Sequence, residues 1–236
     1  MSTRPASFSA LLALFFLLAP ASLPAQGISP DQFDILGVKL GMPGGPELKK
    51  QIEALPDGFK CGEARNNIMS CKGPLSPVPN PRGSTDNNLY IEFDEVSHKV
   101  WKINRSVGQG AGPTPENMLE TLYKKYGQPP PSEVEFKKES NAYTIYWAFD
   151  RNGNVVTKKG NKDITDPFST DNPCHQFSLN ELCGVSLRAS FFSARDGVYA
   201  YYLTLADTRE QYDRKVKRER EEEERKQKAR STPPSF

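Results

Sequence analysis

The stretch ILGVKLGMPGGPELKK, Ile35 to Lys50, joins a short apolar run to a charged segment and decides how the fold begins. Its glycines suggest a phosphate-binding loop, but it has neither the Gly-Lys-Ser/Thr ending nor the G-x-G-x-x-G pattern of such loops. Helix entry fits better, because Pro46 suits the first helical position and Glu47 complements the positive end of a helix. We therefore predict a strand over Phe33–Leu40, followed by a helix. Its apolar stripe, at i, i+4 and i+7, is Leu48, Ile52 and Leu55.

A second helix is predicted after Thr114, which suits the N-cap and is followed by Pro115. Gly127 ends it, with a run of prolines behind. Its buried face would be formed by Met118, Leu119, Leu122, Tyr123 and Tyr126. Residues of this kind at helical spacing are typical of a hydrophobic core, so no cofactor site is predicted from them.

Elsewhere the apolar residues alternate, which is typical of half-buried strands. The predicted strands are Leu89–Phe93, Val100–Arg105, an edge strand Glu133–Lys138, Tyr143–Phe149, Val185–Phe191 and Val198–Leu205. The fold class is therefore α+β, with two helix-plus-antiparallel-sheet units that are either separate or parts of one continuous sheet. The units suggest a pseudo-repeat, 33–107 and 113–206, followed by a charged C-terminal helix.

The ends of the chain differ from its middle. Arg4, the apolar run Leu11–Ala19 and the small residues behind it are typical of a secretory signal peptide, predicted as 1–25 with Ala21 as a second cleavage site. The run is too short to cross a bilayer, which needs about 20 apolar residues. We expect an α+β domain over 26–206, a charged helical tail over 207–230 and a disordered end over 231–236. The tail is interpreted as a solvated helix, with a docking arm as the alternative.

The four cysteines are interpreted as two local disulfides, Cys61–Cys71 and Cys174–Cys183, because an even number in an exported chain favours disulfides. The other two pairings stay open. Structural zinc is disfavoured, because its cysteine pairs are usually two to four residues apart.

Few residues point to chemistry. The two histidines, His98 and His175, offer no convincing partner for a nucleophile, and no G-x-S-x-G motif is present. The segment DRNGN, Asp150 to Asn154, lacks the spacing of a calcium loop and is predicted to be a tight turn. We predict no catalytic residue, no metal ligand and no cofactor. The net charge of +2 and the mixed signs of the tail argue against nucleic acid as a partner.

The segments Ile35–Met42 and LYKKYGQP (Leu122–Pro129), together with the order of a helix followed by antiparallel strands, carry a resemblance. The chain resembles small exported bacterial α/β proteins of the β-lactamase-inhibitor-protein and outer-membrane-assembly-lipoprotein type, although it lacks the lipid-bearing cysteine of the latter. The resemblance implies a binding protein that presents a sheet face, and it transfers no functional residue.

The function expected is a non-catalytic protein-binding module of the bacterial envelope, periplasmic or secreted, acting as an inhibitor or an assembly accessory protein. Its partner would be another protein, with no membrane span in the mature chain. The candidate contact residues are Trp101, Arg188, Phe192, Tyr199, Tyr201 and Tyr202, because tyrosine, tryptophan and arginine are enriched at interfaces. Alternatively these rings only cover the core. Two other functions remain open: a hydrolase that uses carboxylates of the loop Lys158–Asn172, such as Asp163 or Asp166, and an envelope structural protein.

Overall fold

The computed structural model describes residues 28–76, 85–110, 112–129, 135–137, 141–156, 158–159, 162–163, 174, 177, 179–195 and 197–231. The predicted signal peptide and residues 232–236 of the predicted disordered end therefore lie outside the described residues. Ser231 is the last residue of the C-terminal helix.

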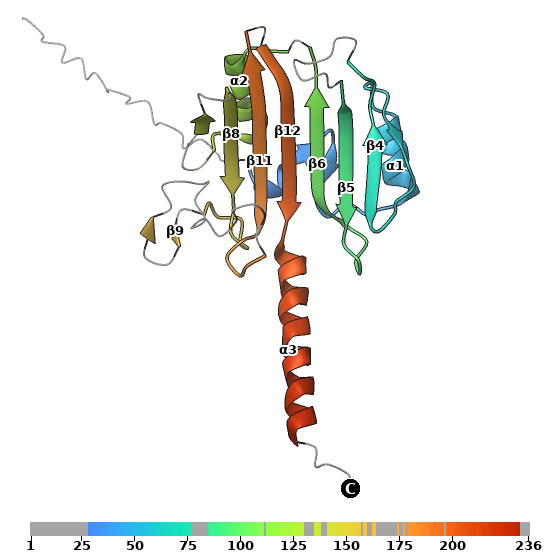
Figure 1. Cartoon of the computed structure of the whole chain (residues 1–236), viewed down its shortest axis with the longest axis vertical. Coiled ribbons are helices and arrows are strands. Elements are labelled where there is room, and N and C mark those ends of the chain that lie inside the picture. The colour runs from blue at the N-terminus through green and yellow to red at the C-terminus, as the bar shows by residue number, and fades with distance from the viewer. Residues whose placement is uncertain are drawn as a thin grey trace, which may run out of the picture.

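The centre of the fold is an eight-stranded antiparallel sheet with the order β3-β4-β5-β6-β12-β11-β8-β7 (Figure 1). The first half of the chain supplies β3 (Lys60–Cys61), β4 (Ile68–Lys72), β5 (Asn87–Phe93) and β6 (Val100–Gly108). The second half supplies β7 (Glu135–Lys137), β8 (Ala142–Ala148), β11 (Val185–Ala194) and β12 (Gly197–Asp207). Each half forms a meander, and β6 pairs with β12 to join them. The predicted α+β class is confirmed, and the sheet is continuous.

Each half is preceded by a helix that begins as the sequence predicts. Helix α1 (Pro46–Glu53) follows Gly45, whose φ of +127° disfavours any residue with a Cβ. Helix α2 (Pro115–Tyr126) is capped by Thr114, whose Oγ1 accepts a hydrogen bond from the Asn117 N–H at 3.3 Å. Gly127, at φ +79°, ends this helix. Both helices bury their apolar residues in one core, so they cover the same face of the sheet (Figure 1).

The predicted single strand over Phe33–Leu40 is wrong. This segment follows a short 3-10 helix, Pro30–Gln32, and forms a tight hairpin of β1 (Asp34–Ile35) and β2 (Val38–Lys39). Leu36 and Gly37 occupy its turn with φ values of +56° and +78°. Two consecutive positive φ angles reverse the chain, and the sequence gives little warning because leucine is rare in that conformation.

The core lies between the helices and the sheet. The pairing register places Leu89, Leu203 and Ile145 in one row across the strands, all facing the helices. Phe33, directly before the hairpin, lies in this core, with its ring 5.4 Å from that of Tyr126 and 5.6 Å from that of Phe149. The segment before α1 is therefore part of the packing that joins α2 to the sheet.

Both predicted disulfides are present. Cys61 and Cys71 are directly opposite each other on β3 and β4, two strands that were not among the predicted ones. The Cys174–Cys183 disulfide lies on the opposite side of the sheet, where it packs with Val156 over Tyr146 and Ala148 of β8. In the predicted loop Lys158–Asn172, the structure describes a small separate hairpin of β9 (Lys158–Lys159) and β10 (Lys162–Asp163).

The last element, α3 (Arg209–Ser231), continues from β12 and projects beyond the end of the sheet (Figure 1). Its first turns are docked. The Arg214 guanidinium contacts the buried Asp94 carboxylate, and Arg151 donates to both oxygens of Asp213 at 2.7 and 2.9 Å. Residues 217–230 are all exposed. The first turns of the tail thus pack against the domain, residues 217–230 form a solvated helix as one interpretation of the tail expects, and the docking arm stays a prediction. None of the helices described here is long and apolar enough to cross a membrane.

Candidate functional site

The side of the sheet opposite α1 and α2, here called the open face, carries a different set of side chains from the core. The register places Tyr90, Asn104, Thr204 and Arg188 in one row on this side, one residue along from the buried row. No helix of the described chain lies across the central strands on this side (Figure 1). The second disulfide covers only the end of β8. The open face is therefore formed mainly by β4, β5, β6, β12 and β11.

Polar side chains tie the strands together along the open face. Lys102 and Glu92 form an ion pair of 2.8 Å, and Asn104 donates to the same Glu92 at 3.3 Å. Thr204 donates to Asn104 Oδ1 at 2.9 Å. These contacts join the side chains of β5, β6 and β12 at the centre of the open face into one polar network.

Large exposed side chains stand around this polar centre. Tyr202 is 48% exposed, Tyr90 38% and Ile68 41%. Such side chains supply contact area in protein interfaces, where tyrosine is enriched. Tyr90 and Ile68 were not among the predicted contact residues. Tyr90 lies between the apolar Leu89 and Ile91, so the alternation of this strand already places it on the opposite face. Ile68 lies in β4, a strand that was not predicted.

Three of the predicted contact residues come together on the open face, and a fourth joins them. Arg188 is exposed on β11, and the ring of Phe192 lies 6.0 Å from that of Tyr202 and 6.3 Å from that of Tyr199. The pairing of β11 with β12 skips Tyr199 in a bulge, so this residue leaves the alternation that the sequence suggested. It is also largely buried, at 8% exposure, so it supports the cluster more than it offers contact area.

The other two predicted contact residues lie elsewhere. Tyr201 faces the helices, where its ring lies 5.9 Å from the Arg105 guanidinium carbon. Trp101 sits in a bulge of β6, since Glu92 pairs with Lys102 and Phe93 with Val100. It lines a groove of about 230 Å³ together with Ile68 and residues of α3, including Arg214. The groove therefore lies between the end of the open face at Ile68 and the first turns of α3.

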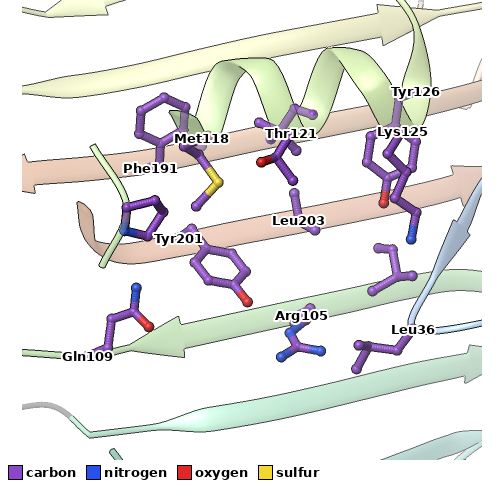
Figure 2. Close-up of a pocket in the computed structure, with 15 residues that line it drawn as sticks. Leu36, Arg105, Gln109, Met118, Thr121, Lys125, Tyr126, Phe191, Tyr201 and Leu203 are labelled. Atoms are coloured by element: carbon purple, nitrogen blue, oxygen red, sulfur yellow. The ribbon is translucent and has the colours of Figure 1, made fainter. Parts of the chain in front are cut away.

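A second concave region lies on the other side of the sheet, under α2 (Figure 2). It has a volume of about 380 Å³, and its lining is mostly apolar. The lining includes Leu36 from the β1–β2 turn, Met118 from α2, and Arg105, Tyr201 and Leu203 from the sheet. This cavity belongs to the helix-covered side, so it is separate from the open face.

Neither region assembles a catalytic group that the sequence suggested. Within the described part of the chain, no three His, Cys, Asp or Glu side chains are grouped so as to hold a metal ion. His98 lies in the turn between β5 and β6. Asp150 organises its predicted tight turn, accepting from the N–H groups of Asn152 and Asn154 at 2.8 and 2.9 Å. Asp166 and His175 lie outside the described residues.

The comparisons with known proteins add no identity. No protein-family model matches the chain, and the searches of curated proteins and of solved structures found no match either.

Proposed function

We propose that this protein is an exported, non-catalytic binding module that docks another protein on the open face of its sheet. The observation that carries the proposal is the group of exposed Tyr90, Tyr202 and Arg188 around a hydrogen-bonded polar centre. Aromatic rings and arginine contribute large contact area and adaptable polar contacts, which is why they dominate the energetics of protein interfaces.

The proposed location is an oxidising compartment outside the cytoplasm, either the periplasm or the exterior of a bacterial cell. Two disulfides support it, because such bonds persist in oxidising compartments and are rare in the cytosol. The secretory pattern of residues 1–25 agrees with this location. The resemblance to inhibitor and assembly proteins suggests the same use of a sheet face, and the partner would then be a hydrolase or an envelope component.

The test is a differential capture experiment with envelope extract from the source cells. Wild-type protein is compared with the Tyr202→Ala, Arg188→Ala double variant, in which two exposed side chains of the open face are truncated. The control is Lys124→Ala, which removes an exposed side chain from α2 on the opposite side of the sheet. Circular dichroism establishes that all three proteins are folded.

The expected result is a protein that is retained by wild type and by Lys124→Ala but lost from the double variant. Loss of two interface side chains of this kind reduces affinity by about ten-fold or more. If every captured protein binds all three forms equally, the open face is not the docking surface and the proposal is wrong.

A further inference from the structure

The cavity under α2 lies where the two helices leave the centre of the sheet to side chains. Helix α1 packs beside β3, and α2 lies over β11 and β8, so the strands between them are less covered (Figure 1). In this region the pairing register sets Arg105, Leu203 and Ala189 side by side on the helix-facing side. Ala189 has the shortest side chain of the three, and it leaves space that Met118 of α2 does not fill.

The space is large enough for a small molecule and open at one margin. Its volume of about 380 Å³ is within the range of ligand sites, which are mostly apolar with a few polar groups. Figure 2 shows Met118 and Thr121 of α2 on one side and Tyr201 and Arg105 on the other. Thr121 is exposed, so the cavity is accessible from solvent along the edge of α2.

Both cations in the lining are already engaged by the protein. Lys125 pairs with Asp34 at 2.9 Å. Arg105 Nη2 lies 3.5 Å from Asp57 Oδ2, and the other two guanidinium nitrogens are enclosed by the protein. A carboxylate in the cavity would have to compete with Asp34 for Lys125, and it would not reach the enclosed donors. Most of the cost of removing its charge from water would therefore remain, so the cavity suits a neutral ligand.

Tyr201 supplies a neutral polar group at this cavity. Its hydroxyl makes no hydrogen bond within the described part of the chain, and unlike the two guanidinium nitrogens it is not enclosed. Figure 2 shows the side chain next to Leu203, with the hydroxyl toward Arg105. A tyrosine hydroxyl both donates and accepts. Because the guanidinium carbon lies 5.9 Å from the Tyr201 ring, its positive charge favours the electronegative end of a ligand dipole at this place.

We propose that the cavity under α2 binds a neutral, mainly apolar molecule with one carbonyl or hydroxyl oxygen. The oxygen accepts a hydrogen bond from the Tyr201 hydroxyl, and the hydrocarbon part packs against Met118, Leu122 and Leu203. Leu36 of the β1–β2 turn also lines the cavity, and a leucine held at φ +56° is strained, as residues at ligand sites often are. The site is independent of the proposed function, because it lies on the other side of the sheet from the open face.

The experiment is calorimetric titration of the disulfide-bonded protein with decanol, and in parallel with decanoate and decylammonium, which carry opposite charges on a chain of the same length. The first variant is Tyr201→Phe, which removes only the hydroxyl. Tyr212→Phe makes the same change in α3, away from the cavity, and is its matched control. The second variant is Thr121→Trp, which places a large ring at the margin of the cavity. Thr121 is exposed, so this change is compatible with folding, and thermal unfolding verifies it for each variant.

Decanol is expected to bind wild type and Tyr212→Phe equally, and Tyr201→Phe about five-fold more weakly, because one neutral hydrogen bond is lost. Decanoate and decylammonium should each bind wild type at least about ten-fold more weakly than decanol, since the anion lacks a free charged donor and the cation meets two like charges. Thr121→Trp should also weaken decanol binding.

Absence of decanol binding would overturn the proposal. So would an affinity for decanol that is unchanged in Tyr201→Phe or in Thr121→Trp. Tighter binding of decanoate or of decylammonium than of decanol would overturn the choice of a neutral ligand.

Discussion

Asp94 links the turn between β5 and β6 to the root of α3, and its removal should destabilise the whole domain. Its side chain is 1% exposed. Oδ1 accepts from the N–H groups of Ser97 and Val96 at 2.7 and 3.0 Å, and Oδ2 contacts Gln211 and Arg214. We predict that Asp94→Ala lowers the free energy of unfolding by about 3 kcal/mol: about 1 for each backbone bond and about 1 for the partly exposed Arg214 pair.

The assay is equilibrium unfolding in urea of Asp94→Ala, Arg214→Ala and the double variant, followed by tryptophan fluorescence. Arg214→Ala alone should cost about 1 kcal/mol, because the turn keeps its backbone bonds. The double-mutant cycle should then give a coupling energy near 1 kcal/mol. The reasoning is refuted if Asp94→Ala is as stable as wild type, or if Arg214→Ala is the more damaging of the two.

The same contact has a defined pH dependence. Burial alone would raise the pKa of Asp94, but the N–H groups of Ser97 and Val96 and the Arg214 guanidinium outweigh it, and the pKa lies below its ordinary value of 3.8. A lowered native pKa gives stability that is present above the unfolded pKa and is lost as pH falls through the native one. Wild type should therefore lose stability below about pH 4, and Asp94→Ala should lack this part of the loss.

Three further predictions concern stability. Replacing Cys61 and Cys71 by serine should lower the free energy of unfolding by about 2.7 kcal/mol in urea titrations, since the bridge closes a loop of 10 residues. Burial raises the pKa of the Tyr146 phenol from 10.0 to about 12, so unfolding titrations should show stability falling between these pH values, and less so in Tyr146→Phe. Truncation after Val216 should leave the thermal unfolding free energy within about 0.5 kcal/mol, because the rest of α3 is exposed.

The sequence predicts those parts of the fold that depend on local rules. Thr114 and Pro115 mark the start of α2, and Gly127 marks its end, because caps act through hydrogen bonds and φ angles within one turn. The alternation of Leu89 and Ile91 predicts β5, because this signal is also local and lies within a single strand. Strand β4 was missed because only two of its residues, Met69 and Cys71, are buried, and a short run of this kind has no distinct period.

The candidate sites were harder to predict because they depend on which strands become neighbours. Tyr202 and Phe192 belong to adjacent strands of the β11–β12 hairpin. Because the sequence predicts both strands and the turn between them, it also predicts that these two residues lie near each other. Tyr199 and Trp101 changed sides because bulges add a residue to one strand without a sequence signal. Arg105 looks like an ordinary surface residue until the pairing of β6 with β12 places it in an apolar row.

The pairing of β6 with β12 also has a consequence for how the chain folds. Every other neighbour in the large sheet comes from the same half of the chain, whereas Asn104 meets Thr204 across a separation of 100 residues. Closing so long a loop is slow compared with forming a hairpin. Until it closes, the two longest hydrogen-bonding margins of the unfinished meanders are unprotected and able to associate with another chain. Each disulfide joins two cysteines of the same half, Cys61–Cys71 in the first and Cys174–Cys183 in the second, so both can form before the halves meet. The slow pairing of β6 with β12 is then the step most exposed to aggregation.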